Sequence, residues 1–137
     1  MSRSGYCDDG DFDNWQMIRW RGAVTSAFKG KRGQAFLREM LAALDALPEK
    51  KLISYDLVQP DGCVCALGAV GKARGTDMSR VDPEDHDGVS GLFGVAHAMA
   101  CEIMFYNDEG SYHYETPEQR FVRMRAWVAC QIKEATP

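Results

Sequence analysis

Apolar side chains recur at helical spacing along most of the chain. Residues 15–28 place Trp20, Val24 and Phe28 on one face, which predicts an amphipathic helix. Residues 34–47 repeat this spacing with leucines and a methionine, which predicts a second helix. The polar, glycine-containing break between the two segments is short, so we expect an antiparallel helical hairpin.

Further helices are expected in the second half of the chain. Residues 66–74 are mostly small and end before Gly75, which predicts a short, closely packed helix with a glycine cap. The Asp-Pro-Glu-Asp sequence at 82–85 is typical of a helix start, and the mostly apolar run 89–106 predicts that this helix is central and buried. A Thr-Pro-Glu-Gln capping box predicts a last helix over about 117–134.

Residues 51–65 follow a different pattern. Ile53, Tyr55 and Leu57 alternate with their neighbours in the period of a strand, and the Pro-Asp-Gly sequence at 60–62 is typical of a turn. The segment therefore predicts a short β-hairpin. Together, these patterns predict a mainly α (α+β) fold, a single-domain helical bundle of about four or five helices with one short β-hairpin.

The chain has 137 residues, which is the usual size of one domain. Residues 1–14 are polar and acidic and are expected to form an N-terminal arm, followed by one helical domain over residues 15–137. No apolar run approaches the roughly 20 residues that cross a bilayer, and the first residues do not resemble a signal peptide. Five cysteines, an odd number, favour free thiols in a reducing compartment, so we expect a cytoplasmic protein with no membrane partner.

The net charge of −4 hides a strong polarity along the chain. Residues 19–38 hold six basic and no acidic side chains, whereas residues 76–118 hold ten acidic side chains and one basic. Such asymmetry is typical of proteins with a charged partner. The alternative is that the two segments neutralise each other within the fold, and the sequence leaves both interpretations open.

Cys65 is a candidate nucleophile. It lies between a predicted strand and the start of a predicted helix, where the helix dipole activates a thiol. His113 and Asn107 follow it in the order that some cysteine hydrolases use. The alternative is a buried structural thiol, and the surrounding sequence lacks a nucleophile signature. We therefore favour a non-enzymatic protein and keep these three residues as the catalytic candidates.

The basic segment is a candidate site for a nucleotide or another phosphorylated molecule. Gly30 and Gly33 flank two basic residues at a predicted helix start, where free N–H groups bind anions, although the sequence is not a Walker A motif. The isoelectric point of about 5.3 disfavours sequence-independent nucleic-acid binding. The candidate ligands of a phosphate are Arg19, Arg21, Lys31, Arg32 and Arg38.

The acidic segment is the candidate surface for a protein partner. A dense group of carboxylates attracts a basic surface and imitates the charge of a phosphate backbone. The same group with His86 offers ligands for a cation, but helix capping explains these acids more simply, so we expect neither a metal nor a cofactor. The candidate partner-binding residues are Asp82, Glu84, Asp85, Asp87, Asp108 and Glu109.

Several short motifs together resemble a family. They are Arg-Trp-Arg-Gly-Ala at 19–23, Lys-Arg-Gly-Gln at 31–34, Cys-Ala-Leu-Gly-Ala at 65–69, Asn-Asp at 107–108 and Thr-Pro-Glu at 116–118. With these motifs, residues 16–133 resemble a group of small bacterial, phage and prophage proteins that has no established activity. The resemblance implies a phage setting and carries over no catalytic residue.

The function we expect is that of a non-enzymatic phage accessory protein. It would bind a host protein or a protein–nucleic acid complex in the host cytoplasm, as an antagonist of host defence of the anti-CRISPR type. Direct nucleic-acid binding is not favoured, and a homodimer is left open. The alternatives are a small-ligand protein that uses residues 19–38 and a cysteine hydrolase centred on Cys65.

Overall fold

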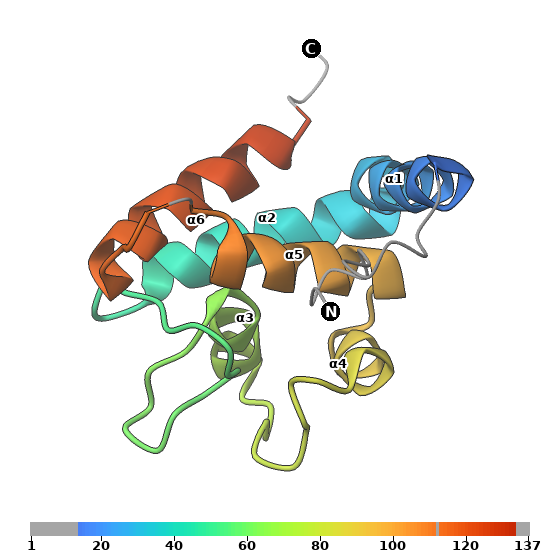
Figure 1. The fold of residues 1–137 in the computed structure, drawn as a ribbon. Coiled ribbons are helices and arrows are strands. Elements are labelled where there is room, and N and C mark those ends of the chain that lie inside the picture. The colour runs from blue at the N-terminus through green and yellow to red at the C-terminus, as the bar shows by residue number, and fades with distance from the viewer. Residues whose placement is uncertain (1–13, 112, 134–137) are drawn as a thin grey trace.

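Six helices occupy the residues that the computed structural model describes, which are 14–111 and 113–133 (Figure 1). The expectation of a mainly helical fold is confirmed, although the helices outnumber those predicted. The expected acidic arm lies outside the described residues apart from its last position. The helices are α1 (Asn14–Lys29), α2 (Lys31–Ala46), α3 (Ala66–Arg74), α4 (His86–Phe93), α5 (His97–Glu109) and α6 (Pro117–Gln131).

Two helices form the centre of the packing. Helix α2 packs against α1, α3 and α6, and α5 packs against α1, α3, α4 and α6. The predicted apolar stripe of α2 is confirmed, since Leu37, Met40 and Leu44 are fully buried. In α1 the stripe is buried only toward its end, where Val24 and Phe28 enter the core.

The predicted antiparallel hairpin of α1 and α2 is wrong. Only Gly30 separates the two helices, and its backbone is extended. One residue is too short a link to reverse the chain direction. Figure 1 instead shows α2 running across the view while α1 points mostly toward the viewer, so the two helices cross at a wide angle.

The predicted long helix over 89–106 is also wrong, because it is two helices. Gly94 adopts a left-handed conformation with φ of 71°, and Gly94 and Val95 both donate backbone hydrogen bonds to the carbonyl of Ser90. This glycine cap ends α4. Among the described helices, none has by itself the length and apolar composition to cross a bilayer; α4 and α5 meet that test only together, with a bend of 105° between them.

Helix α4 also starts later than predicted. Asp85 is its cap and accepts a hydrogen bond from the backbone of Gly88, whereas Asp82 belongs to a preceding turn that closes between Asp82 and Asp85. The Asp-Pro-Glu-Asp sequence therefore provides a cap at its last position rather than its first.

Residues 51–65 do not form the predicted hairpin. Within the described chain there is no strand, and the segment contains one isolated antiparallel bridge between Val58 and Val64. The predicted turn is present, with Gly62 at φ of 90°. A longer ladder does not form because the backbone of Leu52 donates to the start of α6, at the carbonyl of Pro117. Tyr55 also interrupts the extended chain with φ of 68°.

The end of α3 and the start of α6 match the predictions, whereas α6 ends at Gln131 rather than at about residue 134. Gly75 closes α3 in a left-handed conformation, with φ of 70°. Thr116 and Gln119 form the predicted capping box, in which each side chain binds the other residue's backbone N–H. These local signals are confirmed because they need only neighbouring residues.

Candidate functional site

Cys65 and Asn107 lie together at the start of α3. The Sγ atom of Cys65 accepts a hydrogen bond from the backbone N–H of Gly68 at 3.3 Å, so this thiol caps the helix. The side-chain oxygen of Asn107 accepts from the N–H of Ala66 at 3.1 Å. The cavity beside them is only about 10 Å³, which leaves no room for a substrate.

Asn107 also holds the irregular segment before α3. Its amide nitrogen donates to the carbonyl of Ile53 at 2.9 Å and to the carboxylate of Asp108 at 2.8 Å. The same Asp108 oxygen accepts from the backbone of Tyr55 at 2.9 Å. With an exposed fraction of 1%, Asn107 is a buried clamp between α5, α3 and the segment that precedes α3.

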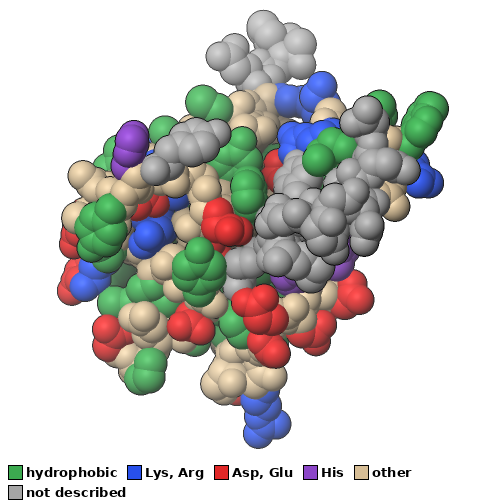
Figure 2. Space-filling model, viewed as in Figure 1, with side chains coloured by type: hydrophobic (Ala, Val, Ile, Leu, Met, Phe, Trp, Pro, Cys, Tyr) green, Lys and Arg blue, Asp and Glu red, His purple; other side chains and the backbone are tan. Residues whose placement is uncertain are grey.

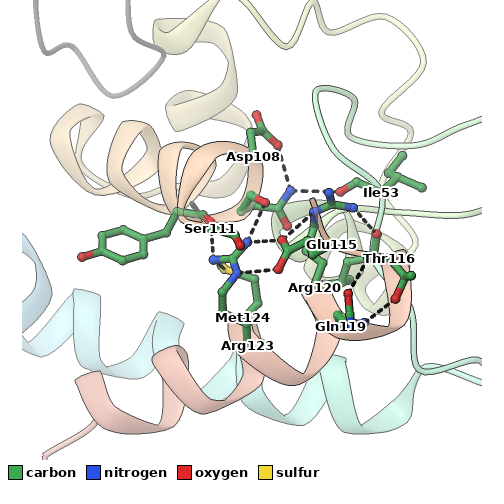
Figure 3. A network of polar contacts seen from close by, with 12 residues as sticks. Ile53, Asp108, Ser111, Glu115, Thr116, Gln119, Arg120, Arg123 and Met124 are labelled. Atoms are coloured by element: carbon green, nitrogen blue, oxygen red, sulfur yellow. Dashed lines mark hydrogen bonds and ion pairs between the residues drawn. The ribbon is translucent and has the colours of Figure 1, made fainter. Parts of the chain in front are cut away.

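A network of arginine contacts continues from this clamp into α6 (Figure 3). Arg123 donates to the carbonyls of Tyr106 and Asn107, and it binds both carboxylate oxygens of Glu115. These hydrogen bonds, and then the positive charges of Arg123 and Arg120, lower the pKa of Glu115 although burial partly opposes them. Arg123 thus adds hydrogen bonds to two carbonyls in the last turn of α5.

His113 does not join Cys65 and Asn107. It is exposed, and its backbone exchanges hydrogen bonds with the hydroxyl of Ser111. In the described chain no hydrogen bond connects its ring to either residue. The hydrogen-bonded pair of nucleophile and base that a cysteine hydrolase needs is therefore not assembled around Cys65.

The predicted phosphate-binding residues are spread over different surfaces. Lys31 and Arg32 line a shallow hollow of about 180 Å³ at the start of α2. Arg21 lines a separate cavity and forms an ion pair with Glu102. Arg38 donates to the carbonyl of Lys133, and Arg19 is exposed on α1. The fold therefore does not bring the five residues to one site.

The predicted acidic surface divides into two parts. Asp82, Glu84, Asp85 and Asp87 lie around the start of α4, and we call these four residues the acidic rim. Asp108 and Glu109 lie at the end of α5, where Asp108 binds the segment before α3. Figure 2 shows several acidic side chains on the lower part of one face, where Figure 1 places α4.

Three of the four rim carboxylates have no ion-pair partner in the basic segments of the described chain. Asp82 and Asp85 accept hydrogen bonds from the backbone N–H groups of Glu84 and Gly88. Within the described residues, no lysine or arginine forms an ion pair with Asp82, Asp85 or Asp87. The lysine and arginine ion pairs seen among the described residues reach acids outside the rim, namely Glu39, Asp45, Glu49, Glu102 and Glu115.

The sequence did not predict one cluster of side chains that could bind a metal ion. His86, His97 and Cys101 each offer a nitrogen or sulfur atom, and these atoms all lie within 4.8 Å of one another. The four-residue spacing of His97 and Cys101 is the sequence signal that places them on one face of a helix. His86 is eleven residues before His97, and only the bend between α4 and α5 brings it near.

Comparison with protein-family models, with curated proteins and with solved structures finds no match. The functional interpretation therefore depends on the geometry of the chain's own residues. Two places in the described structure carry that interpretation, the acidic rim and the cluster of His86, His97 and Cys101.

Proposed function

We propose that the protein is a non-enzymatic phage accessory protein that binds a basic surface through the acidic rim. The observation that carries this proposal is the lack of any lysine or arginine partner for Asp82, Asp85 and Asp87 in the described chain. Carboxylates that the fold does not neutralise attract a partner of opposite charge and speed its association.

The rim is also held in place before it binds. Asp82 and Asp85 are fixed by hydrogen bonds from the backbone of Glu84 and Gly88, at 2.9 Å and 3.1 Å. Side chains that are already ordered lose little conformational entropy on binding. The rim therefore presents a preformed arrangement of negative charge.

The class of partner follows from this charge and from the phage setting that the family resemblance implies. Nucleic-acid-guided defence complexes hold their guide and target strands in positively charged channels. A small protein with a fixed group of carboxylates is suited to occupy such a channel. We therefore propose that the partner is a host protein or protein–nucleic acid complex of this type, and that the protein antagonises host defence.

The test is the plaquing efficiency of a phage on hosts that carry a nucleic-acid-guided defence system. Host cells would produce the wild-type protein, the double variant Asp82→Asn/Glu84→Gln, or the matched control Asp56→Asn/Glu118→Gln. The control removes two exposed acids that lie outside the rim. Both double variants keep side chains of nearly the same size, and the Asp82→Asn change retains a side-chain oxygen that accepts from the backbone N–H of residue 84.

We expect the wild type and the control to restore plaquing, and the rim variant to restore it at least about tenfold less. Failure of the wild type to raise plaquing would contradict antagonism of host defence. Equal plaquing with the rim variant and the wild type would show that the rim is not the contact surface.

A cavity of about 410 Å³ supports a second candidate function, the binding of a small phosphorylated ligand. Arg21, Lys29 and Lys133 line it together with Tyr106 and Trp127, whose rings stack with centroids 4.5 Å apart. Positive charge beside a stacked aromatic pair suits a nucleotide. A nucleotide-dependent rise in melting temperature that disappears in Lys29→Ala/Lys133→Ala would favour this alternative.

A further inference from the structure

His97 and Cys101 lie one helical turn apart at the start of α5 and point their reactive atoms at each other. The Nε2 atom of His97 is 3.4 Å from the Sγ atom of Cys101. In a tetrahedral zinc site, bond lengths of about 2.0–2.1 Å to nitrogen and 2.3 Å to sulfur place neighbouring ligand atoms about 3.3–3.6 Å apart. The two atoms therefore already have the separation of ligands that share one ion.

His86 supplies a third ligand from α4. Its ring centroid is 6.0 Å from that of His97, and its ligand atom lies within 4.8 Å of both others. A small movement of this half-buried imidazole completes three corners of a tetrahedron. A fourth corner is left for water, since the side chain of His97 has an exposed fraction of 45% and opens the cluster to solvent.

Asp87 orients the imidazole of His97. Its Oδ1 atom is 2.8 Å from the Nδ1 atom of His97, on the opposite side of the ring from Cys101. An Nδ1–H group that donates to this carboxylate leaves the lone pair on Nε2, directed at the cluster. This is the carboxylate–histidine arrangement that supports metal ions in proteins.

The charge of the cluster suits a divalent cation. His86 and His97 are the first residues of α4 and α5. The positive ends of the two helix dipoles by themselves disfavour a cation at this place. The thiolate of Cys101 and the carboxylate of Asp87 provide two negative charges that offset this effect. Binding replaces the thiol proton of Cys101, which leaves to solvent.

Asp87, His97 and Cys101 also have the spatial arrangement of a catalytic triad. In that interpretation, Cys101 is the nucleophile, His97 is the base and Asp87 orients the base. Burial disfavours that interpretation. Cys101 has an exposed fraction of 0%, so its Sγ atom is closed to a substrate. A metal ion needs no substrate cavity, and a triad gives no role to His86.

We propose that His86, His97 and Cys101 bind a divalent cation of the zinc type at the junction of α4 and α5. Two imidazoles and a thiolate select borderline ions such as Zn²⁺ and Co²⁺ over Mg²⁺ and Ca²⁺, which prefer oxygen ligands. The site shares Asp87 with the acidic rim. The partner-binding test changes Asp82 and Glu84, whereas the metal test depends on His97 and Cys101, so either proposal stands if the other fails.

The test is a Co²⁺ titration of the full chain, purified without a histidine tag and stripped of metal with a chelator. A thiolate ligand gives Co²⁺ a charge-transfer absorption band, and tetrahedral Co²⁺ absorbs strongly in the visible region. We expect both signals to saturate at one Co²⁺ per chain, and Zn²⁺ to displace Co²⁺ and abolish them. We also expect Zn²⁺ alone, but not Mg²⁺, to raise the melting temperature.

Variants separate the ligands from other residues of the same type. We expect Cys101→Ala to lose the charge-transfer band and His97→Gln to weaken binding at least about 100-fold. Asp87→Asn should weaken binding about 10–100-fold while the stoichiometry stays at one ion. The matched control His113→Gln/Cys130→Ser changes an exposed histidine and an exposed cysteine elsewhere, and it should bind like the wild type.

Several outcomes would overturn the proposal. They are the absence of cobalt absorption in the wild type, a charge-transfer band that survives in Cys101→Ala, or loss of binding in the control. Circular dichroism of each variant checks that it folds, and His97→Gln changes a side chain exposed enough to leave the core intact. Rapid alkylation of Cys101 by iodoacetamide in a protein that binds no cation would assign the triad instead.

Discussion

Asn107 is buried in α5, yet its oxygen and its nitrogen both have hydrogen-bond partners, at Ala66, Ile53 and Asp108. A carboxylate at this position would lack the donor that Ile53 needs, and an apolar side chain would leave a buried N–H and a buried carbonyl unsatisfied. Gln34 acts similarly in α2: its side chain binds the backbone of Phe28 and of α6. At the residue scale, buried polar side chains fix the relative positions of elements that hydrophobic packing alone would position less precisely.

Glu115 provides a prediction at this scale. Hydrogen bonds from Arg123, followed by its charge, lower the pKa of Glu115 below its usual value of 4.5 in the folded state. A lowered carboxyl pKa stabilises the fold fully above pH 4.5, and this contribution disappears as the pH falls through the folded-state pKa. We expect Glu115→Gln to reduce the free energy of unfolding by about 1–2 kcal/mol at pH 7.

The difference between Glu115→Gln and the wild type should shrink as the pH falls below 4.5. Urea unfolding at pH 7, 5, 4 and 3 measures this. The control is Glu118→Gln, an exposed neighbour on α6, which should change the free energy of unfolding by less than about 0.5 kcal/mol. A difference between Glu115→Gln and the wild type that stays constant with pH would contradict the assignment.

At the scale of the elements, glycines decide where helices end and how closely they pack. Gly94 separates α4 from α5 through its left-handed conformation. Gly68 lets α3 approach the preceding segment, since a Cβ atom there would collide with the carbonyl oxygen of Leu57. Gly22 in α1, by contrast, has open space around it.

Replacing Gly68 or Gly22 by alanine should therefore change the free energy of unfolding in opposite directions. Gly68→Ala should destabilise the protein by about 2–3 kcal/mol, because the new methyl group displaces backbone that cannot move freely. Gly22→Ala should stabilise it by about 0.5–1 kcal/mol, because alanine costs less conformational entropy in a helix. Urea unfolding of both variants checks this, and changes of the same sign would contradict the packing of α3.

At the scale of the whole molecule, charged side chains join segments that are far apart in sequence. Arg21 in α1 pairs with the buried carboxylate of Glu102 in α5, 81 residues away. Arg125 in α6 binds Asp45 in α2. The basic segments are thus partly neutralised by acids in other helices, whereas Asp82, Asp85 and Asp87 have no lysine or arginine partner among the described residues.

The pair of Arg21 and Glu102 gives a prediction for the packing of α1 on α5. Exposed fractions of 49% for the Arg21 side chain and 3% for that of Glu102 mean that removing the arginine leaves a buried carboxylate without its cation. We expect Arg21→Ala to lower the free energy of unfolding by about 2 kcal/mol. Arg19→Ala, on the exposed side of the same helix, should change it by less than about 0.5 kcal/mol.

The double variant Arg21→Ala/Glu102→Gln tests the cause. Neutralising Glu102 removes the buried charge, so stability should partly recover relative to Arg21→Ala alone. Urea unfolding of the single and double variants measures this coupling. Equal losses in Arg21→Ala and Arg19→Ala would show that the ion pair does not hold α1 against α5.

The candidate site could be predicted only in part. The sequence predicted a group of carboxylates at a helix start, because capping patterns depend only on neighbouring residues. The structure places the acidic rim there, at the start of α4. It did not predict that Cys65 and Asn107 would serve as a helix cap and a clamp, since the clamp depends on hydrogen bonds across 41 and 54 residues. It also missed the cluster of His86, His97 and Cys101, which spans two helices.

By itself, the sequence determined the helical character of the chain, the stripe of α2, the cap of α3 and the capping box of α6, because each depends on residues within a turn or two of one another. Only the tertiary structure decided the break at Gly94, the missing hairpin and the partners of each charge. These features depend on where a backbone group or side chain finds its partner, and that partner mostly lies in another element. The bend between α4 and α5 therefore replaces the single long helix that was predicted. It also brings together the three ligands of the metal site that we propose.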